Sequence, residues 1–321
     1  MKDTRAAGVL MHITSLPSPY GVGVFGRNTK NFIDFLADMK FTYWQVLPFV
    51  PTDDMNSPYC SPSSFAGNEL FIDPVGLRDS GLCTDADIAD CVYGGSPYTA
   101  AYSFAAEKRE QLLKKAYSKA DGEIKKRAAA FAEEHPHIAE YAYFTALKEK
   151  NGGKPWYEWS KNEADFTRFM KNGGECVKAE FEFICFKQYI FFKQWNEIRK
   201  YAAEKNIKII GDMPIYVALD SADVWACPEN FRIDLKTLKP QSVAGVPPDY
   251  FSEDGQLWAI LSTIGSIWKR TAINGGSSAS ARLSICSTLY ASIISGLLQA
   301  IGRCLPIPIP RKTASGKMDP A

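Results

Sequence analysis

The chain has 321 residues and a formal net charge of +1, and 46% of its residues are hydrophobic and 13% aromatic. This length can hold one large α/β domain with an insertion or two ordinary domains, and either would bury a sizeable core. The near-neutral charge gives no electrostatic support for nucleic acid or an anionic membrane as a partner.

The charge changes sign along the chain. Residues 1–258 contain 30 Lys and Arg against 35 Asp and Glu, whereas residues 259–321 contain seven basic residues and one acid, Asp319. The eight cysteines include no CxxC pair and no spacing typical of zinc ligands, which predicts buried free thiols and no metal. The N-terminus contains too short an apolar run for a secretory signal, which predicts a cytoplasmic protein with reduced cysteines.

The chain begins with the pattern of an α/β fold. Gly8–Thr14 predicts a short buried strand, and a loop rich in Pro and Gly leads to a predicted helix over Asn28–Lys40. A second strand is predicted over Tyr43–Leu47. Within the first loop, Gly21–Gly26 matches the GxGxxG pattern of dinucleotide sites. Because two prolines separate these glycines from the strand and no acid follows the second strand, we interpret them as a loop that needs positive φ at several glycines.

After the second strand comes a long segment, PFVPTDDMNSPYCSPSSFAGNELFIDP, that is dense in Ser, Pro, Asn and aromatic residues. A loop of this length is usually functional or disordered, and Tyr59 and Phe65 argue against disorder. A Tyr beside Ser and Asn at the carboxyl end of a strand is typical of a surface that stacks on a sugar ring. Equally, Tyr59 could pack beneath the loop, and the sequence does not decide between the two.

Residues 78 to 206 are predicted to be mainly helical. Helical apolar spacing covers Ala105–Tyr117, Glu123–Glu134, Ile138–Lys150 and Glu180–Lys205. The aromatic run Phe181–Trp195 is interrupted by Lys187, Gln188, Lys193 and Gln194, which indicates a core helix and not a membrane segment. The Trp156–Trp159 segment is predicted to pack, with sugar binding as the alternative.

The next segment, Lys208–Trp225, carries the first acid to consider for catalysis. The apolar run KII predicts a parallel strand that is broken by Gly211 and Pro214, so Asp212 is set at its carboxyl end, where α/β folds collect catalytic groups. Asp212 could also only cap the turn. Further on, the glycines, prolines and aromatic residues of Ala244–Trp258 predict a lid loop, with an ordinary surface excursion as the alternative.

These segments together resemble one family. HITSLPSPYGVGVFG, YWQVLPFVPT, NSPYCSPSSFAGNELFIDP, FFKQWNEIRKYAAEKNIKIIGDMPIYVALDSADVW and AGVPPDYFSEDGQLW closely resemble the 4-α-glucanotransferases, also called amylomaltases or disproportionating enzymes, of glycoside hydrolase family 77. The resemblance implies a (β/α)8 TIM barrel with helical insertions, a retaining reaction on α-1,4-glucans such as maltodextrin, starch or glycogen, and no cofactor. It also implies that Ser57 and Tyr59 contact sugar, that Asp212 is a supporting acid at the end of the third strand, and that Gln256 and Trp258 contact substrate from the lid.

The resemblance stops after Trp258. Retaining chemistry needs two carboxyl groups, and in this family they lie in motifs resembling RIDHFRG and Glu-Asp-Leu-Gly, which this chain does not contain. Read in the neighbouring frame, Trp258–Gly265 can encode Gly-Asn-Pro-Leu-Tyr-Asn-Trp, and Ala291–Gly302 can encode RIDHFRAFAGYW. The sequence therefore predicts a reading-frame shift at Trp258, with the nucleophilic Asp at the place of Ile293.

The predicted organisation has four parts: 1–77 with the first barrel strands and substrate loop, 78–178 as the helical insertion, 179–258 with the third strand and lid, and 259–321 as a disordered or non-native tail. About three of eight barrel strands would be present, so we expect poor folding and no transferase activity. Two alternatives are a non-catalytic glucan-binding fragment and a membrane anchor over the uncharged segment Leu283–Ile301.

Overall fold

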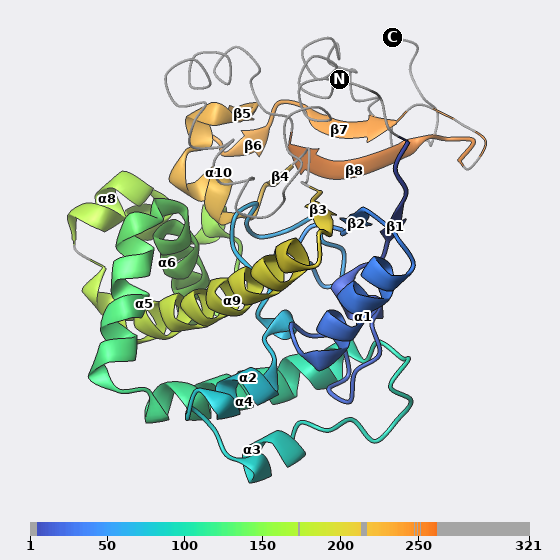
Figure 1. Cartoon of the computed structure of the whole chain (residues 1–321). Coiled ribbons are helices and arrows are strands. Elements are labelled where there is room, and N and C mark those ends of the chain that lie inside the picture. The colour runs from blue at the N-terminus through green and yellow to red at the C-terminus, as the bar shows by residue number, and fades with distance from the viewer. Residues whose placement is uncertain are drawn as a thin grey trace.

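A computed structural model of the chain describes residues 5–172, 174–212, 217–246, 248, 250 and 252–261 (Figure 1). Of the predicted non-native tail, the structure describes the backbone of residues 259–261 and the buried side chain of Leu261, and the rest lies outside the described residues. The possible membrane segment Leu283–Ile301 and Ile293, the predicted place of the nucleophilic Asp, lie outside them as well.

Three short strands form a parallel sheet in the order β1-β2-β3. They are β1 (Gly8–Leu10), β2 (Tyr43–Gln45) and β3 (Lys208–Ile210). Trp44 pairs with Val9 on one side and with Ile209 on the other, and both Trp44 and Ile209 are buried. The predicted parallel α/β arrangement is confirmed, and β1 and β3 are the two edge strands of this sheet as far as the structure describes it.

The predicted first strand is wrong in its second half. Strand β1 ends at Leu10, and residues Ile13–Ser15 form the 3-10 turn η1. The Gly23 backbone lies against this turn, where a Cβ on Gly23 would be 1.7 Å from the Ile13 carbonyl oxygen. Only a glycine permits so close an approach.

The expectation of several glycines with positive φ is also wrong. Of the three glycines in the Gly21–Gly26 motif, Gly21 alone has a positive φ, 82°. Gly23 is needed for close packing, and a Cβ on Gly26 would lie 2.9 Å from the Asp73 carboxyl group. The motif therefore serves contacts between the first loop and its neighbours.

The five predicted helices are present with ends within three residues of the expected positions. They are α1 (Arg27–Asp38), α4 (Tyr102–Lys119), α5 (Gly122–Glu134), α6 (Pro136–Lys150) and α9 (Lys178–Glu204). Five shorter helices complete the described set: α2 (Pro74–Asp79), α3 (Asp85–Ala89), α7 (Lys161–Ala164), α8 (Phe166–Lys171) and α10 (Ala222–Ala226). Helix α9 crosses the molecule, with α5 and α6 packed against it and its C-terminal end leading into β3 (Figure 1).

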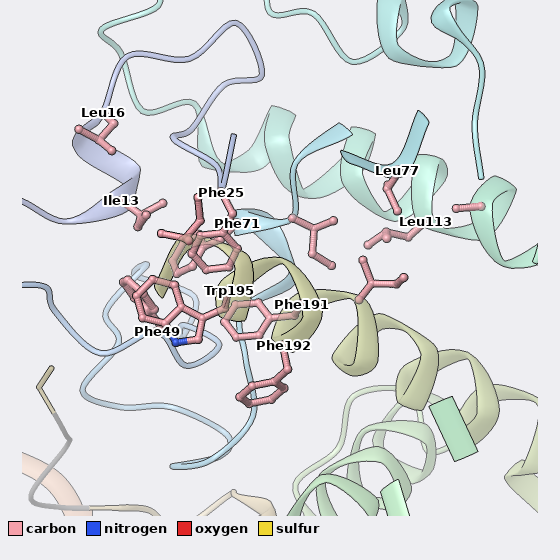
Figure 2. Close-up of a cluster of buried hydrophobic side chains, with 14 of the residues drawn as sticks. Ile13, Leu16, Phe25, Phe49, Phe71, Leu77, Leu113, Phe191, Phe192 and Trp195 are labelled. Atoms are coloured by element: carbon pink, nitrogen blue, oxygen red, sulfur yellow. The ribbon is translucent and has the colours of Figure 1, made fainter. Parts of the chain in front are cut away.

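The aromatic residues of α9 build the main core. Figure 2 shows Trp195 and Phe191 among Phe25, Phe49 and Phe71. The Trp195 ring lies 4.8 Å from that of Phe49 and 5.3 Å from that of Phe25, within the range of favourable aromatic pairs. The core role predicted for the aromatic run is confirmed. None of the helices in the described part of the chain is long and apolar enough to cross a membrane, while the predicted cytoplasmic location stays a prediction.

A second buried cluster joins α6 and α8 to α10, and it includes the tryptophans of the Trp156–Trp159 segment. Trp156 and Trp159 are 1% and 7% exposed, so the packing interpretation is confirmed and sugar contact by these two side chains is excluded. The Trp225 indole donates to the Glu163 carbonyl at 2.8 Å, which ties α10 to α7. The predicted helical insertion thus packs against the segment that follows β3.

The predicted lid region forms strands at both ends. Strands β7 (Val243–Val246) and β8 (Gln256–Leu261) pair in an antiparallel hairpin, and β8 also pairs with β4 (Val217–Ala218). A second hairpin joins β5 (Ile233–Asp234) to β6 (Lys239–Pro240). The prediction of a loop from residue 244 to 258 is therefore wrong at its ends, because backbone pairing with β4 extends the hairpin into a small sheet.

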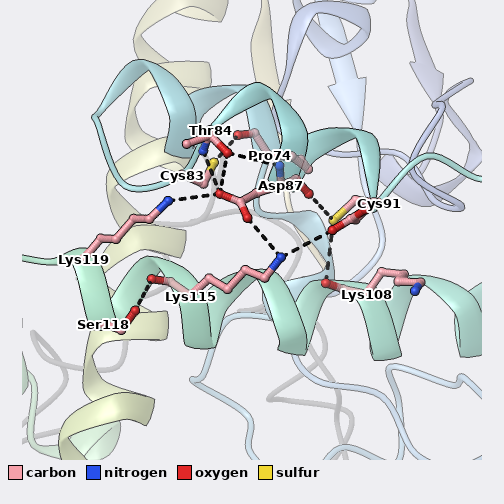
Figure 3. A network of polar contacts seen from close by, with 10 residues as sticks. Pro74, Cys83, Thr84, Asp87, Cys91, Lys108, Lys115, Ser118 and Lys119 are labelled. Atoms are coloured by element: carbon pink, nitrogen blue, oxygen red, sulfur yellow. Dashed lines mark hydrogen bonds and ion pairs between the residues drawn. The ribbon is translucent and has the colours of Figure 1, made fainter.

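Charged side chains hold the short helix α3 on α4. Figure 3 shows Asp87 with Thr84, Lys115 and Lys119 around it. Thr84 and Asp87 form a capping box at the start of α3, and the two lysines lie 3.0 Å from the Asp87 carboxylate. The hydrogen bonds from Thr84, followed by those from the lysines, hold the pKa of Asp87 well below its usual range. The insertion is thus anchored by local capping and ion pairs as well as by its core.

Candidate functional site

The loop that carries the predicted sugar contacts is closed at its base and attached along its length. We call residues 49–68 the 49–68 loop. Its ends meet where the Asn68 amide donates to the Phe49 carbonyl at 2.8 Å. The Ala222 amide of α10 donates to the Pro62 carbonyl at 2.9 Å, and the Ser64 amide donates to the Asp223 carboxylate at 2.8 Å. A segment without regular secondary structure is thereby given a fixed path.

The structure brings together two of the predicted site residues. The Tyr59 hydroxyl donates to the Asp212 carboxylate at 2.9 Å, although 153 positions separate them in sequence. Asp212 follows β3 by two residues, so the contact lies at the carboxyl end of the parallel sheet. Tyr59 is 41% exposed and so does not pack beneath the loop. The pair offers a carboxylate, a phenol and an exposed aromatic ring at one edge of the sheet.

The electrostatics of this pair keep the proton on the Tyr59 hydroxyl group. Burial, together with the hydrogen bond to the Asp212 carboxylate and its charge, raises the pKa of Tyr59 to about 12. The phenol therefore stays protonated at neutral pH and remains the donor in the pair. Such a pair can hydrogen-bond the hydroxyl groups of a sugar whose ring stacks on Tyr59, which is the role predicted for both residues.

Ser57 lies in a turn that orders the tip of the 49–68 loop. Its amide donates to the Asp53 carboxylate at 2.8 Å, and its hydroxyl accepts from the Tyr59 amide at 3.3 Å. Asn56 adopts a left-handed conformation with φ of 59°, which Asn tolerates better than most residues. Asp53 was not among the predicted site residues, and its signal in the sequence is the Asp-Asp-Met-Asn-Ser run that favours side-chain-capped turns.

The remaining two predicted residues, Gln256 and Trp258, lie in strand β8. The partner strand β4 begins at Val217, five positions after Asp212, so the hairpin and the end of β3 are joined by a short segment. The predicted sugar contacts of the Gln256 and Trp258 side chains lie outside what the structure describes.

A pair of half-buried acids beside the loop, Asp223 and Glu140, was not predicted. Burial raises the pKa of Asp223 to about 6 and that of Glu140 to about 7. Glu140 Oε2 lies 2.6 Å from His137 Nδ1, and the His137 ring stacks on Phe65 of the loop with centroids 4.5 Å apart. In the sequence Glu140 carries only helical spacing and Asp223 follows the predicted third strand, and neither pattern shows that α6 and α10 meet at the loop.

A histidine follows strand β1 at the same edge of the sheet. The His12 ring packs at 5.6 Å from the ring of Phe49 and 5.5 Å from that of Phe71, and its Nδ1 is buried without a hydrogen-bond partner in the described structure. Burial lowers the pKa of His12 to about 4, so the imidazole is neutral at physiological pH. Its strand was predicted, but its own position against the aromatic core was not.

Within the described ranges, no group of three or more His, Cys, Asp and Glu side chains is arranged to hold a metal ion. A cavity of about 460 Å³ lies between α1, α2 and α9, with Arg27, Lys30 and Lys193 in its lining. None of the predicted site residues lines this cavity. The candidate site is therefore the open edge at Tyr59 and Asp212.

Known proteins resemble most of this chain. A family model described as 4-alpha-glucanotransferase (Glyco_hydro_77) matches residues 11–263. The 4-alpha-glucanotransferase of Aquifex aeolicus is 42% identical over 261 residues, which cover 79% of this chain and 52% of that protein. The Thermus thermophilus 4-alpha-glucanotransferase is 43% identical over 263 residues, covering 80% of this chain and 52% of that protein. The chain spans about half the length of the curated relatives it matches.

Solved structures agree with this match. The amylomaltase from Streptococcus agalactiae in complex with acarbose superposes with a TM-score of 0.79 at 37% identity, covering 84% of this chain and 55% of that one. The amylomaltase from Corynebacterium glutamicum gives a TM-score of 0.58 at 16% identity, which supports the fold alone.

Proposed function

This chain belongs to the 4-alpha-glucanotransferase family of glycoside hydrolases, and we propose that the edge formed by Tyr59 and Asp212 is where it holds an α-1,4-glucan. In the complete reaction, a segment of a donor glucan would pass to an enzyme carboxylate and then to the 4-hydroxyl group of an acceptor glucan. Ser57, Gln256 and Trp258 belong to the same proposed glucan site, Ser57 from the loop and the other two from the hairpin.

The observation that carries this proposal is the hydrogen bond between Tyr59 and Asp212 at the carboxyl end of β3. Asp212 supplies a carboxylate that can accept from sugar hydroxyls, and Tyr59 presents an exposed ring on which a sugar can stack. The similar amylomaltase from Streptococcus agalactiae has been solved in complex with acarbose. We therefore expect acarbose to bind to the same edge in this chain.

Asp212 would support the reaction without breaking the bond. Retaining transfer needs a nucleophile and an acid/base about 5–5.5 Å apart. The family motifs that would supply them are absent from the 321 residues. We therefore propose that this chain holds glucan without transferring it, and that a chain whose reading frame is restored after Trp258 transfers it.

The finer architecture follows from the same proposal. Strands β1, β2 and β3 would be the first three of a (β/α)8 barrel, with residues 78–178 as an insertion between the second and third. Residues 1–77 and 179–258 would supply the barrel part. Leu10 on β1, Phe35 on α1 and Met39 directly after α1 are exposed, and further barrel elements would cover them.

Titration calorimetry with acarbose and with maltoheptaose tests the proposal. The 321-residue chain is expected to bind both, and Asp212→Asn is expected to weaken binding by about tenfold, as loss of a hydrogen bond to a charged group does. The exposed acid Asp38 gives the control variant Asp38→Asn, which should bind normally. Absence of binding by the unmodified chain would overturn the glucan site, and release of glucose from maltotriose would overturn the proposed inactivity.

A further inference from the structure

We propose that Gln188 is a positioning residue for the 49–68 loop, and that it acts through the loop backbone to hold Tyr59 against Asp212. Gln188 lies on α9 and is fully buried. Its side-chain oxygen accepts from the Gly67 amide at 2.7 Å, and its side-chain nitrogen donates to the Gly67 carbonyl at 2.8 Å. One side chain thus exchanges two hydrogen bonds with one residue, as neighbouring backbones do in an antiparallel sheet.

Gly67 is held from a second direction by the same helix. A Cβ at this position would lie 2.1 Å from the Phe191 ring, which is itself buried in the core. The next residue, Asn68, donates to the Phe49 carbonyl and closes the loop. The returning end of the loop is therefore fixed on α9 at the point where its two ends meet.

Hydrogen bonds continue from this clamp toward Tyr59. The Ser63 hydroxyl accepts from the Ala66 amide at 3.1 Å and from the Phe65 amide at 3.2 Å. The Ser61 hydroxyl accepts from the Ser63 amide at 3.1 Å and donates to its carbonyl at 2.7 Å. Ser61 and Ser63 are buried, so the backbone between Gly67 and Ser61 has little conformational freedom. Ser61 lies two positions from Tyr59. The orientation of Tyr59 thereby depends on a side chain that never contacts it.

The same helix contains a second buried glutamine, Gln194, which contacts a different part of the backbone. Gln194 is also buried, and its amide exchanges two hydrogen bonds with the Asp73 backbone, at 2.7 Å and 3.2 Å. Asp73 lies outside the 49–68 loop, at the start of α2. Replacing either glutamine removes the same kind of interaction, but only Gln188 is connected to the loop.

The test uses the full chain with Gln188→Met, Gln194→Met and Gln188→Glu, measured by hydrogen exchange of the peptides that cover the 49–68 loop. Gln188→Met is expected to speed exchange in the loop by about tenfold, since two buried backbone groups lose their partners. Gln194→Met should speed exchange near Asp73 and leave the 49–68 loop unchanged. Equal exchange of the loop in both methionine variants would overturn the proposal.

The Gln188→Glu variant keeps the proposal testable if the methionine variant fails to fold. A protonated carboxyl group can still accept from the Gly67 amide and donate to its carbonyl, whereas a carboxylate cannot donate. Loop protection is therefore expected at acid pH and should be lost as the introduced acid ionises. The unmodified chain at each pH is the reference, because Asp223 and Glu140 also titrate in this range. A loop protection in Gln188→Glu that follows that of the unmodified chain at every pH would contradict the proposed role.

The link to sugar rests on the proposed function and is tested separately. If the chain binds acarbose, Gln188→Met should weaken binding by about tenfold and Gln194→Met by less than about twofold. Equal weakening by both variants would overturn the link between Gln188 and the site. If the unmodified chain binds no acarbose, the proposed function fails, and the exchange measurement alone still decides whether Gln188 positions the loop.

Discussion

Two regions of the molecule hold the same loop by different chemistry. On the α9 side, the neutral amide of Gln188 clamps the Gly67 backbone. On the α10 side, the Asp223 carboxylate accepts from the Ser64 amide, and Glu140 of α6 adds a second half-buried acid nearby. Both regions satisfy backbone groups of a loop that has no strand or helix of its own.

The two regions differ in whether their anchoring side chains gain and lose a proton near neutral pH. An amide has the same hydrogen-bonding groups at every physiological pH, whereas burial has moved the pKa values of Asp223 and Glu140 to about 6 and about 7. The α9 anchor should therefore be insensitive to pH and the α10 anchor sensitive to it. As pH rises through this range, the loop that carries Tyr59 is therefore expected to lose its anchor on α10 before its anchor on α9.

The largest effect on the free energy of unfolding is expected from Gly67→Ala, which disrupts the α9 anchor. The added Cβ would lie 2.1 Å from the Phe191 ring, whose buried position leaves it no room to move. Overpacking of this kind lowers the free energy of unfolding by about 3 kcal/mol, measured by urea denaturation. Gly122→Ala is the control, because nothing lies within 4 Å of a Cβ there, and it should not destabilise the chain.

Asp223→Ala disrupts the α10 anchor and is expected to have a smaller effect on the free energy of unfolding. It removes the acceptor of the Ser64 amide and should lower the free energy of unfolding by about 1–3 kcal/mol. Part of this loss is offset because an unfavourably buried charge is also removed. Urea denaturation at pH 7 measures the change. An effect larger than that of Gly67→Ala would reverse the proposed order of the two anchors.

The pH dependence separates the anchors directly. A carboxyl group whose pKa is raised by folding binds its proton more tightly in the folded state, so its contribution favours folding below about pH 4 and is lost as pH rises through about 6 to 7. The double variant Asp223→Asn with Glu140→Gln should therefore lose less stability than the unmodified chain between pH 4 and 7.

Thermal unfolding across this range measures the pH dependence, with Asp38→Asn as the exposed control. The groups that face the two acids are His137, the Ser64 amide and hydroxyl, and Cys227, whose thiol pKa is raised to about 11 by burial. An identical pH profile in the double variant would show that the two acids do not make the α10 anchor sensitive to pH.

The sequence predicted the elements of this fold better than their contacts. The helices and parallel strands were predictable because apolar spacing and strand-breaking residues are local signals, as with Gly211 after β3. The hairpin strands β7 and β8 were missed because backbone pairing with each other and with β4 forms them. Periodicity carries no information about such partners.

The candidate site shows the same division. Residue type and position in the sequence point to Tyr59 and Asp212 separately, and the structure adds that their side chains hydrogen-bond to each other. In the sequence Gln188 is only a polar interruption of an aromatic helix, and no pattern marks Asp223. Gln188 contacts Gly67 across 121 positions and Asp223 contacts Ser64 across 159 positions, and a single sequence does not reveal such contacts.

The smallest effect on stability is expected at the tip of the loop, from Tyr59→Phe. It removes one largely exposed hydrogen bond to Asp212, so the free energy of unfolding should fall by only about 0.5–1 kcal/mol. If both anchors hold the loop as argued, exchange within residues 60–68 should not change, while acarbose binding weakens because the phenol is lost and Asp212 is no longer held. Tyr157→Phe, a partly exposed tyrosine on η3 (Trp156–Glu158), is the matched control for both measurements. Faster exchange throughout the 49–68 loop in Tyr59→Phe would mean that the tip holds the loop in place, and the roles assigned to Gln188 and Asp223 would have to be exchanged with that of Tyr59.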